Sequence, residues 1–90
     1  MTVARHVMIT GRVQGVFFRA WAQGHARELG VSGWIRNCAD GSVEAHLEGD
    51  ENAVDRMIDR MRSGPSNARV EDVAVDDAEL EGLGRFEVRH

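Results

Sequence analysis

Apolar residues recur at helical spacing in two stretches of this chain, and each stretch is flanked by segments in which apolar and polar residues alternate. This pattern limits the possible folds more than any other feature of the sequence. Alternation over residues 3–13 predicts a strand with one buried face. Helical spacing follows over residues 18–29, and the Gly30 directly after it is typical of a helix C-terminus. The chain is therefore expected to begin with a strand and then a helix.

The middle of the chain has the pattern of a β-hairpin followed by a second helix. A short strand is predicted over residues 31–37, and apolar residues alternate with polar ones again over residues 42–48. The Asp40-Gly41 pair between them is a strong signal for a tight turn. Helical spacing returns over residues 51–62, with Asp50 suited to cap the start of that helix.

The last third of the chain adds two strands. Gly64-Pro65 is expected to stop the second helix, and three valines predict a fourth strand over residues 70–75. The acidic, glycine-containing stretch 76–84 is expected to be a loop. Phe86 and Val88 then alternate with charged residues, which predicts a short fifth strand.

This order of elements favours one topology. A strand–helix–strand crossover makes the first two strands parallel and is right-handed. The tight hairpin makes the third strand antiparallel to the second, and the economical arrangement places it between the first two, with both helices on one face. That is a ferredoxin-like α/β sandwich, an α+β fold. Ninety residues are enough for one domain and too few for two, so residues 1–90 are expected to form a single domain.

The charge balance and the amino-acid usage exclude several function classes. All eleven basic residues are arginine, against fifteen acidic residues, for a formal net charge of −4. A nucleic-acid module needs a strongly basic face, so no nucleic-acid partner is expected. The absence of lysine removes Schiff-base chemistry. No apolar stretch approaches the roughly 20 residues of a membrane span, and no signal peptide is apparent, so the protein is expected to be cytoplasmic, without a membrane partner.

The residues that most often bind metals or act as nucleophiles are dispersed. A single cysteine, Cys38, cannot form an internal disulfide or a four-cysteine zinc site, and nothing near it in sequence indicates nucleophilic catalysis. The four histidines show no metal-ligand spacing and are expected to be structural or at the surface: His6, His25, His46 and His90. Neither a metal nor another cofactor is therefore expected. The aromatic residues Phe17, Phe18 and Trp34 are expected to pack in the core or in loops rather than to stack on bases.

One loop has the features of an anion site. Gly15 lets backbone N–H groups approach a ligand closely, and the helix that follows has unpaired N–H groups at its start. Arg19 adds a planar fork that matches a phosphate or a carboxylate. Asn37 ends the second strand, which is parallel to the first and therefore ends at the same edge of the sheet. The axes of these two strands are expected to lie about 10 Å apart, so the side chains of Arg19 and Asn37 are expected to reach one small ligand. The alternatives to a functional role are that Arg19 is a solvated surface residue and that Asn37 only supports a turn.

At these residues the chain resembles the acylphosphatase family. The resemblance rests on the stretch Gly11–Arg19, on Leu29–Asn37 and on Asp40–Glu44, and it covers nearly the whole chain. It implies an enzyme, an acylphosphate phosphohydrolase that cleaves acyl phosphates to carboxylate and inorganic phosphate without metal, cofactor or covalent intermediate. Inorganic phosphate would be both product and competitive inhibitor, and the protein is expected to be a monomer.

The resemblance also implies roles for individual residues. Arg19 and Asn37 would be the catalytic residues, with Asn37 orienting the attacking water. The phosphate would be bound by consecutive residues of one loop: Gly15, Val16, Phe17, Phe18 and Arg19. The chemistry agrees, because a carboxylate leaving group needs no general acid and phosphoryl transfer relies on positioning and charge stabilisation. Two alternatives stay open: a non-enzymatic anion-binding module of this fold, and a detached copy of the similar domain of larger carbamoyl-handling proteins.

Overall fold

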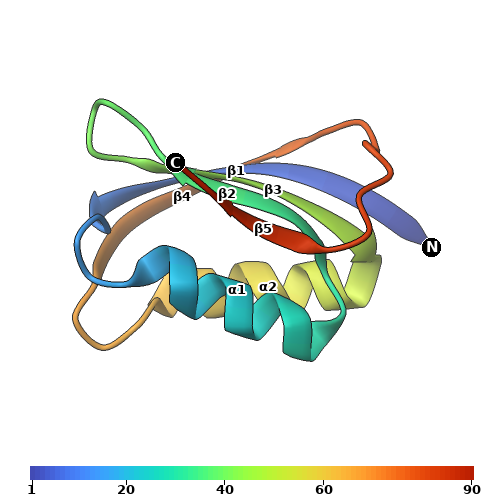
Figure 1. The fold of residues 1–90 in the computed structure, drawn as a ribbon, viewed down its shortest axis with the longest axis horizontal. Helices are drawn as coiled ribbons and strands as arrows, with labels where there is room; N and C mark the ends of the chain where they lie inside the picture. The colour runs from blue at the N-terminus through green and yellow to red at the C-terminus, as the bar shows by residue number, and fades with distance from the viewer.

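In the computed structural model, which describes residues 1–90, a five-stranded sheet is covered on one face by two helices (Figure 1). The elements in chain order are β1 (Thr2–Arg12), α1 (Phe18–Leu29), β2 (Ser32–Asn37), β3 (Val43–Asp50), α2 (Glu51–Ser63), β4 (Arg69–Asp77) and β5 (Phe86–Arg89). The predicted ferredoxin-like arrangement of strands and helices is confirmed.

The sheet has the strand order β4-β1-β3-β2-β5. As predicted, β3 lies between β1 and β2 and pairs antiparallel with both. The sequence did not place β5, which pairs parallel to β2 at the sheet edge. Because parallel strands end at the same edge, this pairing brings the end of the chain to the end of β2. Figure 1 shows the C-terminus on the side where β1 leads into α1.

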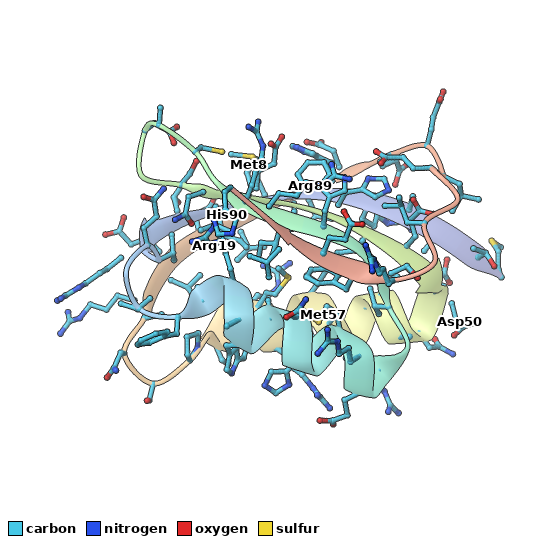
Figure 2. The ribbon with its side chains drawn as sticks, viewed as in Figure 1. Met8, Arg19, Asp50, Met57, Arg89 and His90 are labelled. Atoms are coloured by element: carbon cyan, nitrogen blue, oxygen red, sulfur yellow. The ribbon has the colours of Figure 1, made fainter.

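The core lies between the sheet and the helices. Its largest fully buried side chains come from both layers: Ile9, Phe18, Ile35, Leu47, Met57 and Met61. Burying each of these stabilises the fold by about 1.5–3 kcal/mol relative to exposure. The predicted cap of α2 is confirmed, because the Asp50 carboxylate accepts a hydrogen bond from the Asn52 N–H at 3.1 Å. Figure 2 labels Asp50 at the start of α2 and Met57 within it.

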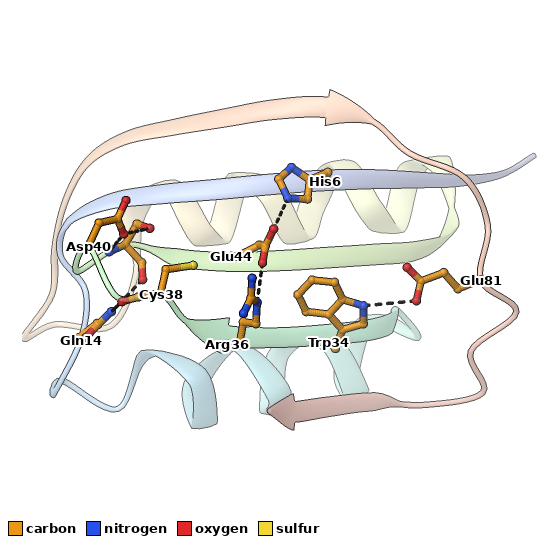
Figure 3. A network of polar contacts seen from close by, with 9 residues as sticks. His6, Gln14, Trp34, Arg36, Cys38, Asp40, Glu44 and Glu81 are labelled. Atoms are coloured by element: carbon orange, nitrogen blue, oxygen red, sulfur yellow. Dashed lines mark hydrogen bonds and ion pairs between the residues drawn. The ribbon is translucent and has the colours of Figure 1, made fainter. Parts of the chain in front are cut away.

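The opposite face of the sheet carries a polar row across three strands. Glu44 of β3 accepts a hydrogen bond from Nε of Arg36 of β2 and is hydrogen-bonded to the His6 ring at 2.7 Å (Figure 3). Its contact with His6 is the main cause that lowers the pKa of the Glu44 carboxyl; burial opposes this, and Arg36 adds to it. The row joins β1, β3 and β2 on the side that the helices leave open.

Strand ends differ from the prediction by up to two residues. β3 runs on to Asp50, and β4 runs on to Asp77, so the first two residues of the expected 76–84 loop are strand. The cause is pairing with the long first strand, in which His6 and Arg5 are the partners of Asp76 and Asp77. The sequence did not indicate this extension of β4. Exposed acidic residues lack the alternation with buried apolar residues that predicts a strand, yet their backbones can still pair with a neighbouring strand.

Candidate active site

The loop between β1 and α1 has a left-handed turn at two positions. Gly15 has φ 73°, and Phe17, at the N-cap of α1, has φ 61° and is the only non-glycine residue with positive φ. No side chain caps this helix, and its first turn contains no acidic residue. The first backbone bond of the helix is from the Trp21 N–H to the Phe17 carbonyl. The N–H groups before Trp21 therefore have no helical partner, as an anion site requires.

This loop forms a pocket of about 350 Å³ with the ends of β2 and β5. The pocket is lined by Val13, Gly15, Phe17, Phe18, Arg19, Ala20, Asn37 and Val88. Of the residues named from the sequence, the structure brings together Gly15, Phe17, Phe18, Arg19 and Asn37. Val16 is placed differently, because its side chain is buried in the core, so only its backbone is available to a ligand.

The Arg19 side chain is held by the end of the chain. Its Nη1 donates to the carbonyl oxygen of Arg89 at 2.9 Å and lies 3.2 Å from Nδ1 of His90. Figure 2 shows Arg19, rising from α1, next to His90. Sequence reasoning missed Arg89 and His90, because they lie about seventy residues from Arg19. The signal that was available was the short fifth strand, whose position beside β2 would have brought both residues next to Arg19.

The Asn37 side chain lines the pocket and makes no hydrogen bond within the chain. The turn after it is held by other groups. Asp40 accepts from the backbone N–H of Ser42 at 3.0 Å and from the Ser42 hydroxyl. These bonds, the hydroxyl first, lower the pKa of the Asp40 carboxyl. The turn therefore does not depend on the Asn37 amide, which is left facing the pocket.

Gln14 joins the two loops that build the pocket. Its Nε2 donates to the carbonyl oxygens of Cys38 at 2.7 Å and Ser42 at 2.9 Å (Figure 3). One side chain thus fixes the turn after Asn37 against the loop before Arg19. Sequence reasoning placed Gln14 within the stretch Gly11–Arg19 but assigned it no role of its own. Cys38 is a free, half-buried thiol whose backbone takes part in this turn, and it does not line the pocket.

A group of possible metal ligands lies outside this pocket. His46, Glu48 and Glu81 offer ligand atoms within 4.8 Å of one another, although their sequence spacing gave no sign of it. His46 stacks on Trp34, on the open face of the sheet. The Glu48 carboxylate is occupied by the His46 ring at 2.7 Å and by the backbone N–H groups of Glu81 and Gly82. The group thereby anchors the loop between β4 and β5.

Three aromatic residues have different surroundings. Phe18 is buried in the core, as expected. Trp34 is half-buried on the open sheet face, with the Arg89 guanidinium 5.0 Å from its ring centre. Phe17, which was expected to pack in the core or the loop, is 81% exposed instead. The left-handed conformation of Phe17 at the N-cap turns it away from the core that takes up its neighbour.

The family model and the curated relatives that match this chain agree on one family. The acylphosphatase family model matches residues 5–88. An acylphosphatase of Roseiflexus sp. is 60% identical over 76 residues, which are 83% of this chain and 82% of the relative. One of Haloquadratum walsbyi is 50% identical over 84 residues, covering 93% and 90% of the two chains. The crystal structure of the Bacillus subtilis acylphosphatase superposes with a TM-score of 0.94 at 35% identity, over 100% of both chains. Neither helix of this chain is long and apolar enough to span a membrane.

Proposed function

Since this chain belongs to the acylphosphatase family, we propose that Arg19 and the 15–19 loop hold the phosphate of its substrate while Asn37 positions the attacking water. The reaction is hydrolysis of an acyl phosphate. The water oxygen bonds to phosphorus, the bond from phosphorus to the acyl oxygen breaks, and the electron pair leaves with the carboxylate. Inorganic phosphate is the second product, and the proton that water loses passes to phosphate or to solvent.

The observation that carries this division of roles is the shared pocket of Arg19 and Asn37 beside an uncapped helix start. The helix N–H groups and the guanidinium are donors that suit the charged phosphate oxygens. Because Arg89 and His90 both contact Nη1 of Arg19, the guanidinium is fixed in direction, and its Nε and Nη2 have no partner in the chain and are free for the phosphate. Such preorganised donors are the main source of catalysis in phosphoryl transfer.

Asn37 suits the water because its amide is neutral and has no partner in the chain. Its oxygen accepts a hydrogen bond from the water without repelling the phosphate. A carboxylate at this place would face the phosphate at about 4 Å, where two like charges repel by roughly 4 kcal/mol at an effective dielectric of about 20. The leaving carboxylate has a conjugate acid with a pKa near 4, so it departs without a general acid. The pocket lining contains no acidic residue, histidine or cysteine to serve as one.

A pair of substrates that differ in leaving group tests this proposal. Acetyl phosphate should be hydrolysed, with inorganic phosphate as a competitive inhibitor. Phenyl phosphate releases a phenol of pKa near 10 and should not be turned over measurably, because the pocket supplies no proton. Equal turnover of both would contradict the proposal. Carbamoyl phosphate belongs in the same series, and a strong preference for it would favour a kinship with the carbamoyl-handling domains.

The remaining parts of the proposal concern the state of the protein. We place it in the cytoplasm as a monomeric single domain that uses neither metal nor nucleic acid. The formal charge of −4 and the dispersed arginines support the absence of a nucleic-acid partner. Light scattering at micromolar concentration tests the monomer, and a mass of twice 10.0 kDa would contradict it.

A further inference from the structure

Phe17 combines two unfavourable features at one residue. Its side chain is 81% exposed, although its ring is apolar. Its backbone has φ 61°, a conformation that costs a non-glycine residue roughly 1 kcal/mol or more. A glycine at this position would remove both costs. Strain of this kind is concentrated at active sites and ligand-binding loops.

The position of Phe17 indicates which ligand. It lines the same pocket as Arg19 and Asn37, immediately before the start of α1. The other exposed large apolar side chains are Met1 and Leu80, and neither lines the pocket. The exposed ring is therefore specific to the rim of the proposed active site.

The pocket has two chemical halves. Arg19, Asn37 and the free helix N–H groups form a polar half. The apolar half consists of the side chains of Val13, Phe17, Phe18, Ala20 and Val88. Its volume of about 350 Å³ lies in the range of small-molecule sites and leaves room beyond a phosphate. An acyl phosphate has the same division into a charged and a less polar half.

We propose that Phe17 is a specificity-determining residue, whose exposed ring contacts the acyl group and raises kcat/KM for acyl phosphates with an aromatic acyl group. This inference rests on the proposed placement of the phosphate at Arg19. With the phosphate there, the acyl carbon chain extends toward the rim, where an aryl ring stacks on the exposed face or edge of Phe17. The strained backbone presents the ring before the substrate arrives, so little ordering is needed on binding.

The test compares benzoyl phosphate with acetyl phosphate as the ratio of their kcat/KM values. Both substrates carry the same phosphate, so any disturbance of the loop backbone by a substitution divides out of the ratio. Phe17→Ala should lower the benzoyl-to-acetyl ratio about three- to tenfold, the range expected for the loss of one aromatic contact. Phe17→Leu keeps apolar bulk and should lower the ratio less. Leu80→Ala, at an exposed residue outside the pocket, is the matched control and should leave the ratio unchanged.

The outcomes separate the two proposals. An unchanged or raised ratio in Phe17→Ala, with both substrates still hydrolysed, would overturn the role of Phe17 and leave the proposed function standing. If the Arg19→Ala variant instead hydrolyses acetyl phosphate as fast as wild type does, the placement of the phosphate at Arg19 is overturned.

Discussion

The guanidinium of Arg19 is tied to the main chain of Arg89, with 2.9 Å between Nη1 and the carbonyl oxygen. An arginine side chain has about 2 kcal/mol of rotamer entropy to lose when it becomes fixed. The parallel pairing of β5 with β2 places this carbonyl beside Arg19, so the side chain already loses part of this entropy when the protein folds. The last strand of the sheet thus holds, through its backbone, an arginine of the proposed active site.

Two substitutions of Arg19 should distinguish the contribution of its positive charge to catalysis from the contribution of its planar guanidinium. Arg19→Lys keeps the charge but loses the planar fork and the bond to Arg89, and it should lower kcat/KM for acetyl phosphate about 10²–10³-fold. Arg19→Ala should lose at least as much and also weaken inhibition by inorganic phosphate. Circular dichroism and thermal unfolding check that both variants fold. A folded Arg19→Ala protein within a few-fold of wild-type activity would contradict the phosphate-binding role.

Removal of metal ions should leave the activity unchanged. The pocket lining contains no histidine, cysteine or carboxylate that would hold a divalent cation. Acetyl phosphate turnover should be the same before and after exhaustive dialysis against a chelator. His46→Gln disrupts the one group of possible ligands, at His46, Glu48 and Glu81, and serves as a second check. An inactive chelated sample that Mg²⁺ or Zn²⁺ restores would contradict the metal-independent mechanism.

Cys38 neighbours Asn37 in sequence but should not act as a nucleophile. Its thiol does not line the pocket, and its backbone serves the turn to which Gln14 is bonded. Cys38→Ser should therefore retain most of the kcat, and no phosphorylated or acylated enzyme should appear by mass spectrometry after mixing with substrate. A folded but inactive Cys38→Ser variant would support a covalent intermediate instead.

Glu48 should make the stability of the protein depend on acid pH. Burial works against ionisation, but hydrogen bonds from the Glu81 N–H, the His46 ring and the Gly82 N–H outweigh it and lower the pKa of this carboxyl. A folded-state pKa below the unfolded value stabilises the protein above the ordinary glutamate pKa of about 4.3, and this contribution is lost as the pH falls through the folded value.

The measurement is the free energy of unfolding in urea between pH 7 and pH 2. Glu48→Gln should be less stable than wild type by about 1–3 kcal/mol at pH 7, because a charged acceptor is lost in a buried site. The difference should shrink below about pH 4, since the wild-type carboxyl then becomes neutral too. Glu44 is present in both proteins, so its own titration cancels. A difference that stays constant with pH would contradict this role of the Glu48 charge.

Much of the fold could be predicted because local signals and burial agree along the chain. The helix ends at Gly30 and Asp50 and the tight turn at Asp40-Gly41 have local causes, and the structure shows each of them. The edge strand β5 could not be placed, because its partner is chosen by long-range pairing. Arg89 was missed because it contacts Arg19 through a backbone carbonyl, which no sequence pattern records. Phe17 was placed in the loop correctly, but the exposure of its ring was not foreseen, because the direction of that ring depends on the φ of a single residue.

The division of roles between Arg19 and Asn37 is tested most directly by kcat and phosphate inhibition in Asn37→Ala. The account predicts a kcat for acetyl phosphate lowered by about 10²-fold or more, with an inhibition constant for inorganic phosphate and a melting temperature close to wild type. The affinity persists because Arg19 and the loop still bind phosphate, and the stability persists because the Asn37 amide holds no part of the turn. Asn37→Asp should lose affinity as well as kcat, through repulsion of the phosphate. A folded Asn37→Ala protein with near-normal kcat would contradict the water-positioning role.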